Sequence, residues 1–186
     1  MRNCVAFEGT RRIAAGELPK VALAAKRVLD RGERAPVLIF DEETSEAVEV
    51  DFRGSADDVL RRLEGAPDER RPPGRPKLGV IGREVTLLPR HWEWLNSQPG
   101  GASVALRKLV EEARRANAGR DRTRQAQEAA YRFMSAMAGN EVGFEEAIRA
   151  FFAGKRQSFE DIIKRWPKDV RDHAKKLASA AFTGGV

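Results

Sequence analysis

Hydrophobic positions in the first third of the chain change from strand-like to helix-like spacing. Within residues 3–17 two short apolar segments flank a turn at Gly9 and Thr10, which predicts a pair of strands. Residues 18–30 then carry apolar positions at helical spacing, with Pro19 in the first turn and Gly32 just past the end. These two signals predict a helix directly after the strand pair.

The following segment, up to residue 64, predicts a hairpin and a short helix. Residues 35–40 read as a buried strand, residues 41–47 as an acidic turn, and residues 48–52 alternate apolar with charged positions. Ser55, with Asp58 three residues later, has the spacing of a helix N-terminal cap. Residues 1–64 are therefore expected to form a small α+β module.

The second half of the chain is dominated by helical spacing. Residues 65–79 are a linker by composition, rich in Pro, Gly and charge. Residues 80–119 predict a short strand, a helix that begins at Pro89, a break at residues 99–101 and a second helix capped by Ser103. A polar break at residues 119–123 separates this strand-helix-helix unit from an all-helical region, residues 120–186. The predicted helices of that region are 125–138, 144–153, one capped by Ser158, and 168–182.

Positive charge is concentrated in the middle of the chain. Residues 70–124 hold 13 Lys and Arg against 5 Asp and Glu, whereas residues 1–69 hold 11 against 15. Such a concentration is typical of proteins that bind a polyanion, because each cation releases counterions from phosphates. A solubilising surface is the alternative reading of the same charges.

A single strand followed by two helices has no sheet of its own. The backbone donors of the segment before Pro89 need a partner, and the same strand of a second chain would supply one. Residues 83–110 resemble the ribbon-helix-helix family (MetJ/Arc type) in the strand that ends at a proline, in apolar positions at +3 and +6, and in the Gly-x-Ser turn at residues 101–103. A plain strand-helix-helix packing unit that binds nothing is the alternative.

The ribbon-helix-helix resemblance implies a homodimer on double-stranded DNA. A two-stranded ribbon would enter the major groove with Arg83, Val85 and Leu87 facing the bases. Only Arg83 among them can make a bidentate guanine contact, so phosphate binding is favoured over base readout. The resemblance further implies a phosphate held at the start of the second helix, by Gly101, Ala102 and Ser103. Two nearby cations, Arg90 and Arg107, are expected to take part in DNA binding.

The linker carries a second nucleic-acid signal. Residues 70–77 resemble an AT-hook core, a Gly-Arg-Pro sequence with basic flanks, in which Arg71, Arg75 and Lys77 would lie along a narrow minor groove. A proline-stiffened basic linker is the alternative reading. The position of the linker, directly before the predicted ribbon, favours a DNA-binding arm.

Several classes of protein are disfavoured by composition. One cysteine, Cys4, allows no disulfide within the chain, and two histidines with one cysteine exclude a Cys-rich zinc site. His173 lies near two aspartates, but no nucleophile or pocket motif accompanies it, so we expect neither an enzyme nor a cofactor. The sequence shows no apolar run of membrane-spanning length and no signal peptide, which predicts a cytoplasmic protein.

The sequence therefore favours a homodimeric DNA-binding protein, a transcription regulator or a nucleoid-associated factor. An antitoxin-like adaptor that grips a protein partner through the C-terminal helices is the alternative, since adjacent Phe151 and Phe152 predict an exposed aromatic face. The whole chain also resembles an uncharacterised bacterial family of about this length, a resemblance that implies bacterial origin but no activity.

Overall fold

The computed structural model describes residues 2–32, 35–64 and 81–183. Three strands and seven α-helices lie in these residues, and the fold is α+β, as the sequence predicts. The contacts divide the chain into two units: residues 1–67 with residues 120–186, and residues 68–119. The N-terminal sheet and the C-terminal helices thus belong to one unit.

The three strands form one antiparallel sheet. The central strand is β1 (Asn3–Glu8), which pairs with β2 (Arg11–Glu17) on one side and β3 (Val37–Asp41) on the other. The predicted strand pair around residues 9 and 10 is confirmed. Gly9 turns the chain with a φ of +54°, a conformation that suits a residue without Cβ.

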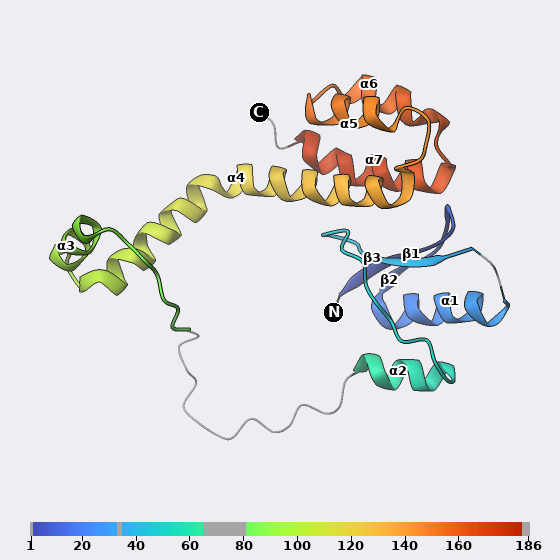
Figure 1. Cartoon of the computed structure of the whole chain (residues 1–186), viewed down its shortest axis with the longest axis horizontal. Coiled ribbons are helices and arrows are strands. Elements are labelled where there is room, and N and C mark those ends of the chain that lie inside the picture. The colour runs from blue at the N-terminus through green and yellow to red at the C-terminus, as the bar shows by residue number, and fades with distance from the viewer. Residues whose placement is uncertain (1, 33–34, 65–80, 184–186) are drawn as a thin grey trace. The chain divides into compact units, whose positions relative to one another are not determined.

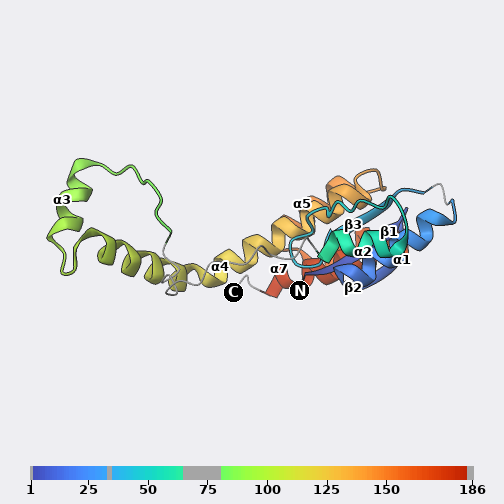
Figure 2. The ribbon, with the colours of Figure 1, turned by 90° about the horizontal axis from the view of Figure 1, so that it is seen from below.

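The central strand is buried on both faces, and its side chains alternate between two cores. Cys4 and Ala6 pack towards α1 (Leu18–Asp30), which covers one face of the sheet. Val5 and Phe7 face the opposite way and join the core of the C-terminal helices. Figure 1 shows the sheet between α1 and the helices α4 and α7, with α2 on the same side as α1, and Figure 2 shows the same elements from below.

The predicted hairpin after β3 is incomplete. The turn is present: Asp41 N–H donates to the Glu46 carbonyl at 2.9 Å, and Val48 N–H donates to the Ile39 carbonyl at 2.8 Å. The pairing ends there, with a single bridge between Phe40 and Ala47, so residues 48–52 are not a strand as predicted. Their apolar side chains instead pack against the α1 core. The alternating pattern is therefore explained by this packing and not by further strand hydrogen bonds.

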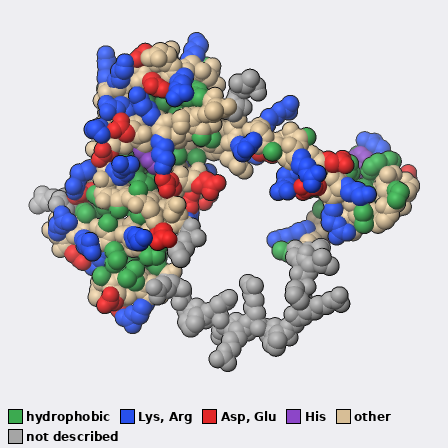
Figure 3. All heavy atoms as spheres, turned by 180° about the vertical axis from the view of Figure 1, so that it is seen from behind, with side chains coloured by type: hydrophobic (Ala, Val, Ile, Leu, Met, Phe, Trp, Pro, Cys, Tyr) green, Lys and Arg blue, Asp and Glu red, His purple; other side chains and the backbone are tan. Residues whose placement is uncertain are grey.

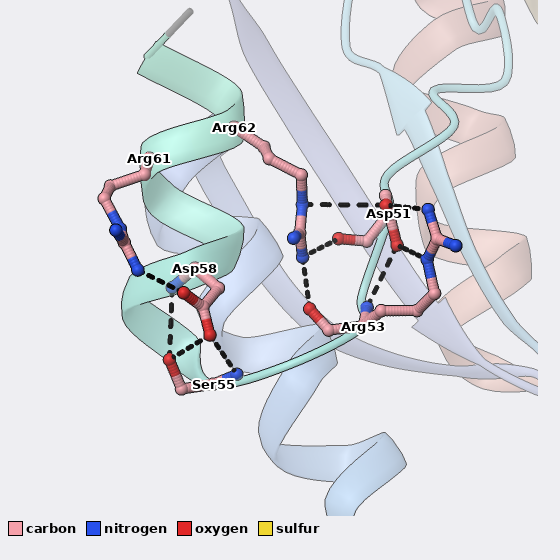
Figure 4. Close-up of polar contacts among 6 residues, drawn as sticks. All are labelled: Asp51, Arg53, Ser55, Asp58, Arg61 and Arg62. Atoms are coloured by element: carbon pink, nitrogen blue, oxygen red, sulfur yellow. Dashed lines mark hydrogen bonds and ion pairs between the residues drawn. The ribbon is translucent and has the colours of Figure 1, made fainter.

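The short helix α2 (Ala56–Glu64) begins at the predicted cap. Ser55 Oγ accepts the Asp58 N–H at 3.2 Å, and Asp58 Oδ2 accepts the Ser55 N–H at 2.8 Å. Figure 4 shows a second polar group next to the cap, in which Arg62 donates to the Asp51 carbonyl at 2.9 Å and Arg53 pairs with the Asp51 carboxylate at 2.7 Å. These contacts fasten α2 to the segment that precedes it.

The C-terminal helices follow the predicted order. Their bounds are α4 (Gly101–Ala138), α5 (Phe144–Phe152), α6 (Arg156–Ile162) with a 3₁₀ turn (Ile163–Arg165), and α7 (Lys168–Thr183). The third helix starts two residues before Ser158, so the predicted cap there is wrong. Helix α7 agrees with the prediction to within one residue.

Helix α4 continues through the predicted break at residues 119–123, so that prediction is wrong. A glycine inside a helix costs about 1 kcal/mol, which its neighbours can offset. Arg115 pairs with Glu111 at 3.1 Å and Arg124 pairs with Glu128 at 3.3 Å, both four residues apart along the helix. No proline interrupts the segment, and polarity alone does not end a helix.

An aromatic cluster joins the sheet to the C-terminal helices. Phe133 of α4 lies with its ring centroid 5.4 Å from Phe7 of β1 and 5.5 Å from Phe40 of β3. His173 of α7 completes the cluster, 4.5 Å from Phe133 and 5.7 Å from Phe7. All four side chains are buried. The two ends of this unit, far apart in sequence, are therefore held together by one core.

Candidate nucleic-acid interface

The segment before Pro89 is not a strand in the single chain. Residues 81–88 lie in neither a helix nor a strand, which differs from the sequence prediction. Leu88 has extended dihedral angles (φ −67°, ψ 150°), and Pro89 starts α3 (Pro89–Ser97) immediately after it. A strand needs a hydrogen-bonded neighbour, and this structure of one chain holds no second copy to supply it.

A glycine turn joins α3 to α4. Gly100 and Gly101 have φ values of +87° and +76°, and the Gly101 N–H donates to the Gln98 carbonyl at 2.9 Å. A Cβ on Gly100 would lie 3.2 Å from the Val104 side chain, so both the conformation and the space require glycine. The predicted helix from Pro89 and the break before a second helix are confirmed, but α4 begins at Gly101, so the predicted cap at Ser103 is wrong.

This helix pair buries few apolar side chains. In the described part of the second unit, residues 81–119, Leu95 and Ala105 are the buried hydrophobic residues. The apolar position at +3 from Pro89 is Trp92, which is 37% exposed rather than buried, and Val110 of α4 is 64% exposed. A unit this small is not expected to be stable on two buried side chains without further support. The hydrophobic side chains of this unit are therefore mostly exposed, where in a stable unit they would be buried in a core.

The same unit carries cations without carboxylate partners. Residues 81–119 contain six Lys and Arg residues, and Arg114 and Arg115 share Glu111. The remaining four are exposed and form no ion pair in the described residues: Arg83, Arg90, Arg107 and Lys108. Figure 3 shows Lys and Arg side chains beside hydrophobic ones on the surface of this part of the chain.

The predicted DNA-contacting residues are only partly brought together. Gly101, Ala102 and Ser103 form the first turn of α4, where backbone N–H groups lack intrahelical acceptors. Arg107 lies one turn further along the same helix. Along the predicted ribbon Arg83 and Val85 are exposed and Leu87 is half-buried. Arg90 is exposed at the start of α3.

The AT-hook-like residues Arg71, Arg75 and Lys77 lie outside the described residues. His173, which lies near two aspartates in the sequence, is 3% exposed inside the aromatic cluster. Its neighbour in sequence, Asp172, pairs with Lys168 at 2.9 Å instead. Among the described residues no group of three His, Cys, Asp or Glu side chains could hold a metal ion.

One feature of the first unit is not predicted from the sequence. Residues 41–47 are expected only as an acidic turn, yet residues 42–46 form one wall of a cleft with α4 and α7. A cluster of carboxylates between two strands was the available signal. The location of the other walls depends on the packing of α4 and α7, which the turn itself does not encode.

None of the helices in the described residues has the length and hydrophobicity needed to cross a bilayer. Comparison with curated proteins gave no match, and comparison with solved structures gave none either. Comparison with protein families matched residues 3–178, nearly the whole chain. The chain belongs to DUF2239, a family described as an uncharacterized protein conserved in bacteria.

Proposed function

We propose that this protein binds double-stranded DNA as a homodimer, as a transcription regulator or a nucleoid-associated factor, through residues 81–119. The observation that carries the proposal is the combination, within residues 81–119, of an exposed apolar surface, a segment without a strand partner among the described residues, and four cations without an ion pair there. Each of these features is costly or unused in a single chain. A second copy and a polyanion together would satisfy all three.

The backbone of residues 81–88 and the apolar surface of α3 and α4 support the proposal of a dimer. Residues 81–88 hold donors and acceptors that an antiparallel copy of the same segment would pair. Pairing would bring two α3–α4 units together, so that exposed side chains such as Trp92 and Val110 share a core. The chain has one cysteine, Cys4, which is buried in the other unit, so no disulfide within the chain stabilises residues 81–119.

The cations without ion pairs in residues 81–119 support the proposal of DNA binding. A lysine or arginine already paired with a carboxylate must break that pair before it contacts a phosphate. Arg83, Arg90, Arg107 and Lys108 have no such pair with any residue that the structure describes. Two copies in a dimer would present eight such cations. Because only Arg83 lies at a predicted groove-facing position as a guanine reader, we expect binding of modest sequence preference.

A four-residue substitution tests the DNA proposal. Replacing Arg83, Arg90, Arg107 and Lys108 by Ala is expected to weaken binding of a labelled duplex at least hundredfold at low salt, measured by fluorescence anisotropy. The matched control replaces four exposed, unpaired cations of the other unit by Ala: Arg27, Arg31, Lys155 and Arg165. Both variants lower the net charge by four, so an equal loss in both would contradict the assignment to this unit.

A single substitution tests the dimer. Val110→Glu places a charge on the uncovered apolar face, where it costs little in one chain but would be buried between two. Sedimentation velocity is expected to give a dimer for the wild type and a monomer for the variant. Val142→Glu is the matched control, because Val142 is 70% exposed in the other unit. A wild type that sediments as a monomer at micromolar concentration would contradict the dimer.

A protein-binding adaptor is the second candidate, and one observation favours it. Phe152 of α5 is 50% exposed and lies 5.8 Å, between ring centroids, from Tyr131 of α4, which is 44% exposed. The neighbouring Phe151 is buried. Of the two adjacent phenylalanines on α5, Phe152 alone therefore contributes to the predicted aromatic surface. An apolar interface of this kind would persist at high salt, whereas DNA binding would not.

A further inference from the structure

A cleft of about 620 Å³ lies in the first unit, apart from the residues proposed to bind DNA. One wall is the turn after β3, residues 42–46, and the others are α4 and α7. A volume of this size is in the range of sites for small organic molecules. The described residues of the cleft come entirely from segments that pack into one unit.

The turn that forms the first wall is held in place by hydrogen bonds. Asp41 Oδ1 accepts the backbone N–H groups of Glu43 and Thr44, each at 2.9 Å, and Asp41 Oδ2 accepts Arg2 Nε at 2.6 Å. Burial alone would raise the pKa of Asp41, but these hydrogen bonds outweigh it and lower the pKa to about 2. The turn is therefore preorganised around an ionised carboxylate.

Four apolar side chains, three of them alanines, line the cleft between the two helices, and we call them its floor. Ala126 and Ala129 come from α4, and Leu177 and Ala180 from α7. Three alanines leave space between the two helices that larger side chains would fill. A ligand that occupies this space must have an apolar body.

The cations at the rim are already engaged, and this decides the charge of the ligand. Arg132 donates to the Thr44 carbonyl, Lys176 pairs with Glu42, and Arg122 also has a partner. By contrast, the carboxylate of Glu43 forms no hydrogen bond or ion pair among the described residues, and Glu46 reaches Arg2 only at 3.9 Å. The charged groups at the rim that remain able to pair with a ligand are therefore carboxylates.

We propose that this cleft binds a small organic cation, with a primary ammonium group at Glu43 and Glu46 and a short apolar body on the alanine floor. The ammonium would donate to the two carboxylates, whose hydrogen-bonding capacity the protein leaves unused. The apolar body would displace water from the space between α4 and α7. The site is independent of DNA binding, since none of the proposed DNA-contacting residues lines it.

Three probes with one carbon skeleton and different charge test the proposal on the full chain. Isothermal titration calorimetry with cyclohexylmethylamine, cyclohexylmethanol and cyclohexanecarboxylate is expected to rank the amine at least tenfold tighter than the alcohol, and the carboxylate weakest. Glu43→Gln should remove most of the advantage of the amine over the alcohol, while Glu145→Gln, an exposed and unpaired carboxylate on α5, should not.

A second variant tests the floor. Ala180→Leu adds bulk at an exposed position of α7 and is expected to weaken the amine and the alcohol alike, with no change in the thermal unfolding midpoint. The proposal is overturned if the carboxylate binds as tightly as the amine, if no probe binds at millimolar concentration, or if Glu43→Gln and Ala180→Leu both bind the amine as the wild type does.

Discussion

Phe133→Ala is expected to lower the free energy of unfolding of the sheet-containing unit by about 4 kcal/mol. Phe133 is fully buried and touches the rings of Phe7, Phe40 and His173, so its removal opens a cavity between the sheet and the helices. The lost contacts join the two ends of this unit, and the cavity cannot close without moving one against the other. This is a large part of the stability of a typical domain.

Urea denaturation measures this effect. Trp166 is buried in the same core, so its fluorescence reports on this unit once Trp92 and Trp94 are replaced by Phe. Phe152→Ala provides the comparison, because Phe152 is half-exposed and its removal leaves little cavity. A loss for Phe133→Ala no larger than that for Phe152→Ala would show that the sheet and the C-terminal helices do not share a core.

The stability of the same unit is expected to fall by about 3 kcal/mol as the pH drops from 7.5 to 4, through His173 alone. The pKa of His173 is lowered from 6.5 to about 4, mainly by burial and also by Lys176 and Arg12, against the opposing effect of Glu42. Nε2 has no hydrogen-bond partner in the described residues. The folded protein therefore holds the neutral imidazole, whereas the unfolded chain takes up a proton below pH 6.5.

The pH range over which stability is lost is set by the pKa of each group in the folded and in the unfolded chain. Stability from the neutral imidazole is present above pH 6.5, is lost as the pH falls below it and reaches its full loss near pH 4. Asp41 acts in a lower window: its pKa is about 2 in the folded state, so its contribution is lost as the pH falls below 3.8. The two groups are therefore separable by titration.

His173→Phe keeps an aromatic ring between Phe7 and Phe133 but cannot be protonated. Unfolding in urea at pH 7.5, 6, 5 and 4.5 is expected to show a fall of about 2 to 3 kcal/mol for the wild type that the variant lacks. Equal pH dependence in the two proteins would mean that the imidazole is accessible to protons in the folded state.

Local patterns predicted the elements whose signals lie within a few residues. The turn at Gly9, the helix that begins at Leu18 and the cap at Ser55 all combine a hydrophobic period with a turn or capping residue. The same holds for the turn at Gly100 and Gly101, where consecutive glycines permit positive φ. These elements depend on side chains that are neighbours in sequence.

The elements that differ from the sequence prediction are those whose conformation depends on tertiary packing. Residues 48–52 alternate like a strand, but the α1 core takes their apolar side chains without further pairing. Polar residues at 119–123 resemble a linker, yet α4 continues through them, because the segment contains no proline and its neighbours on both sides are helical. The shared core of Phe7, Phe133 and His173 joins residues more than a hundred positions apart, which no local period can indicate.

The candidate DNA interface was predicted as a set of residues rather than as a surface. The sequence identified the cations and the residues at the start of α4, because charged residues and glycine turns can be recognised from residue types alone. It could not show that Trp92, Leu109 and Val110 remain uncovered in one chain, since exposure depends on how α3 meets α4. That exposure is the strongest support for a second copy.

Binding of the wild-type protein to DNA as a function of salt tests the central claim most directly. Anisotropy of A·T-rich and G·C-rich duplexes, titrated between 50 and 200 mM salt, is expected to give a logarithm of the binding constant that falls linearly with the logarithm of salt, by about 0.9 for each phosphate neutralised. Several contacts in a dimer predict a steep slope. Absence of binding to either duplex at about 50 mM salt would contradict the account.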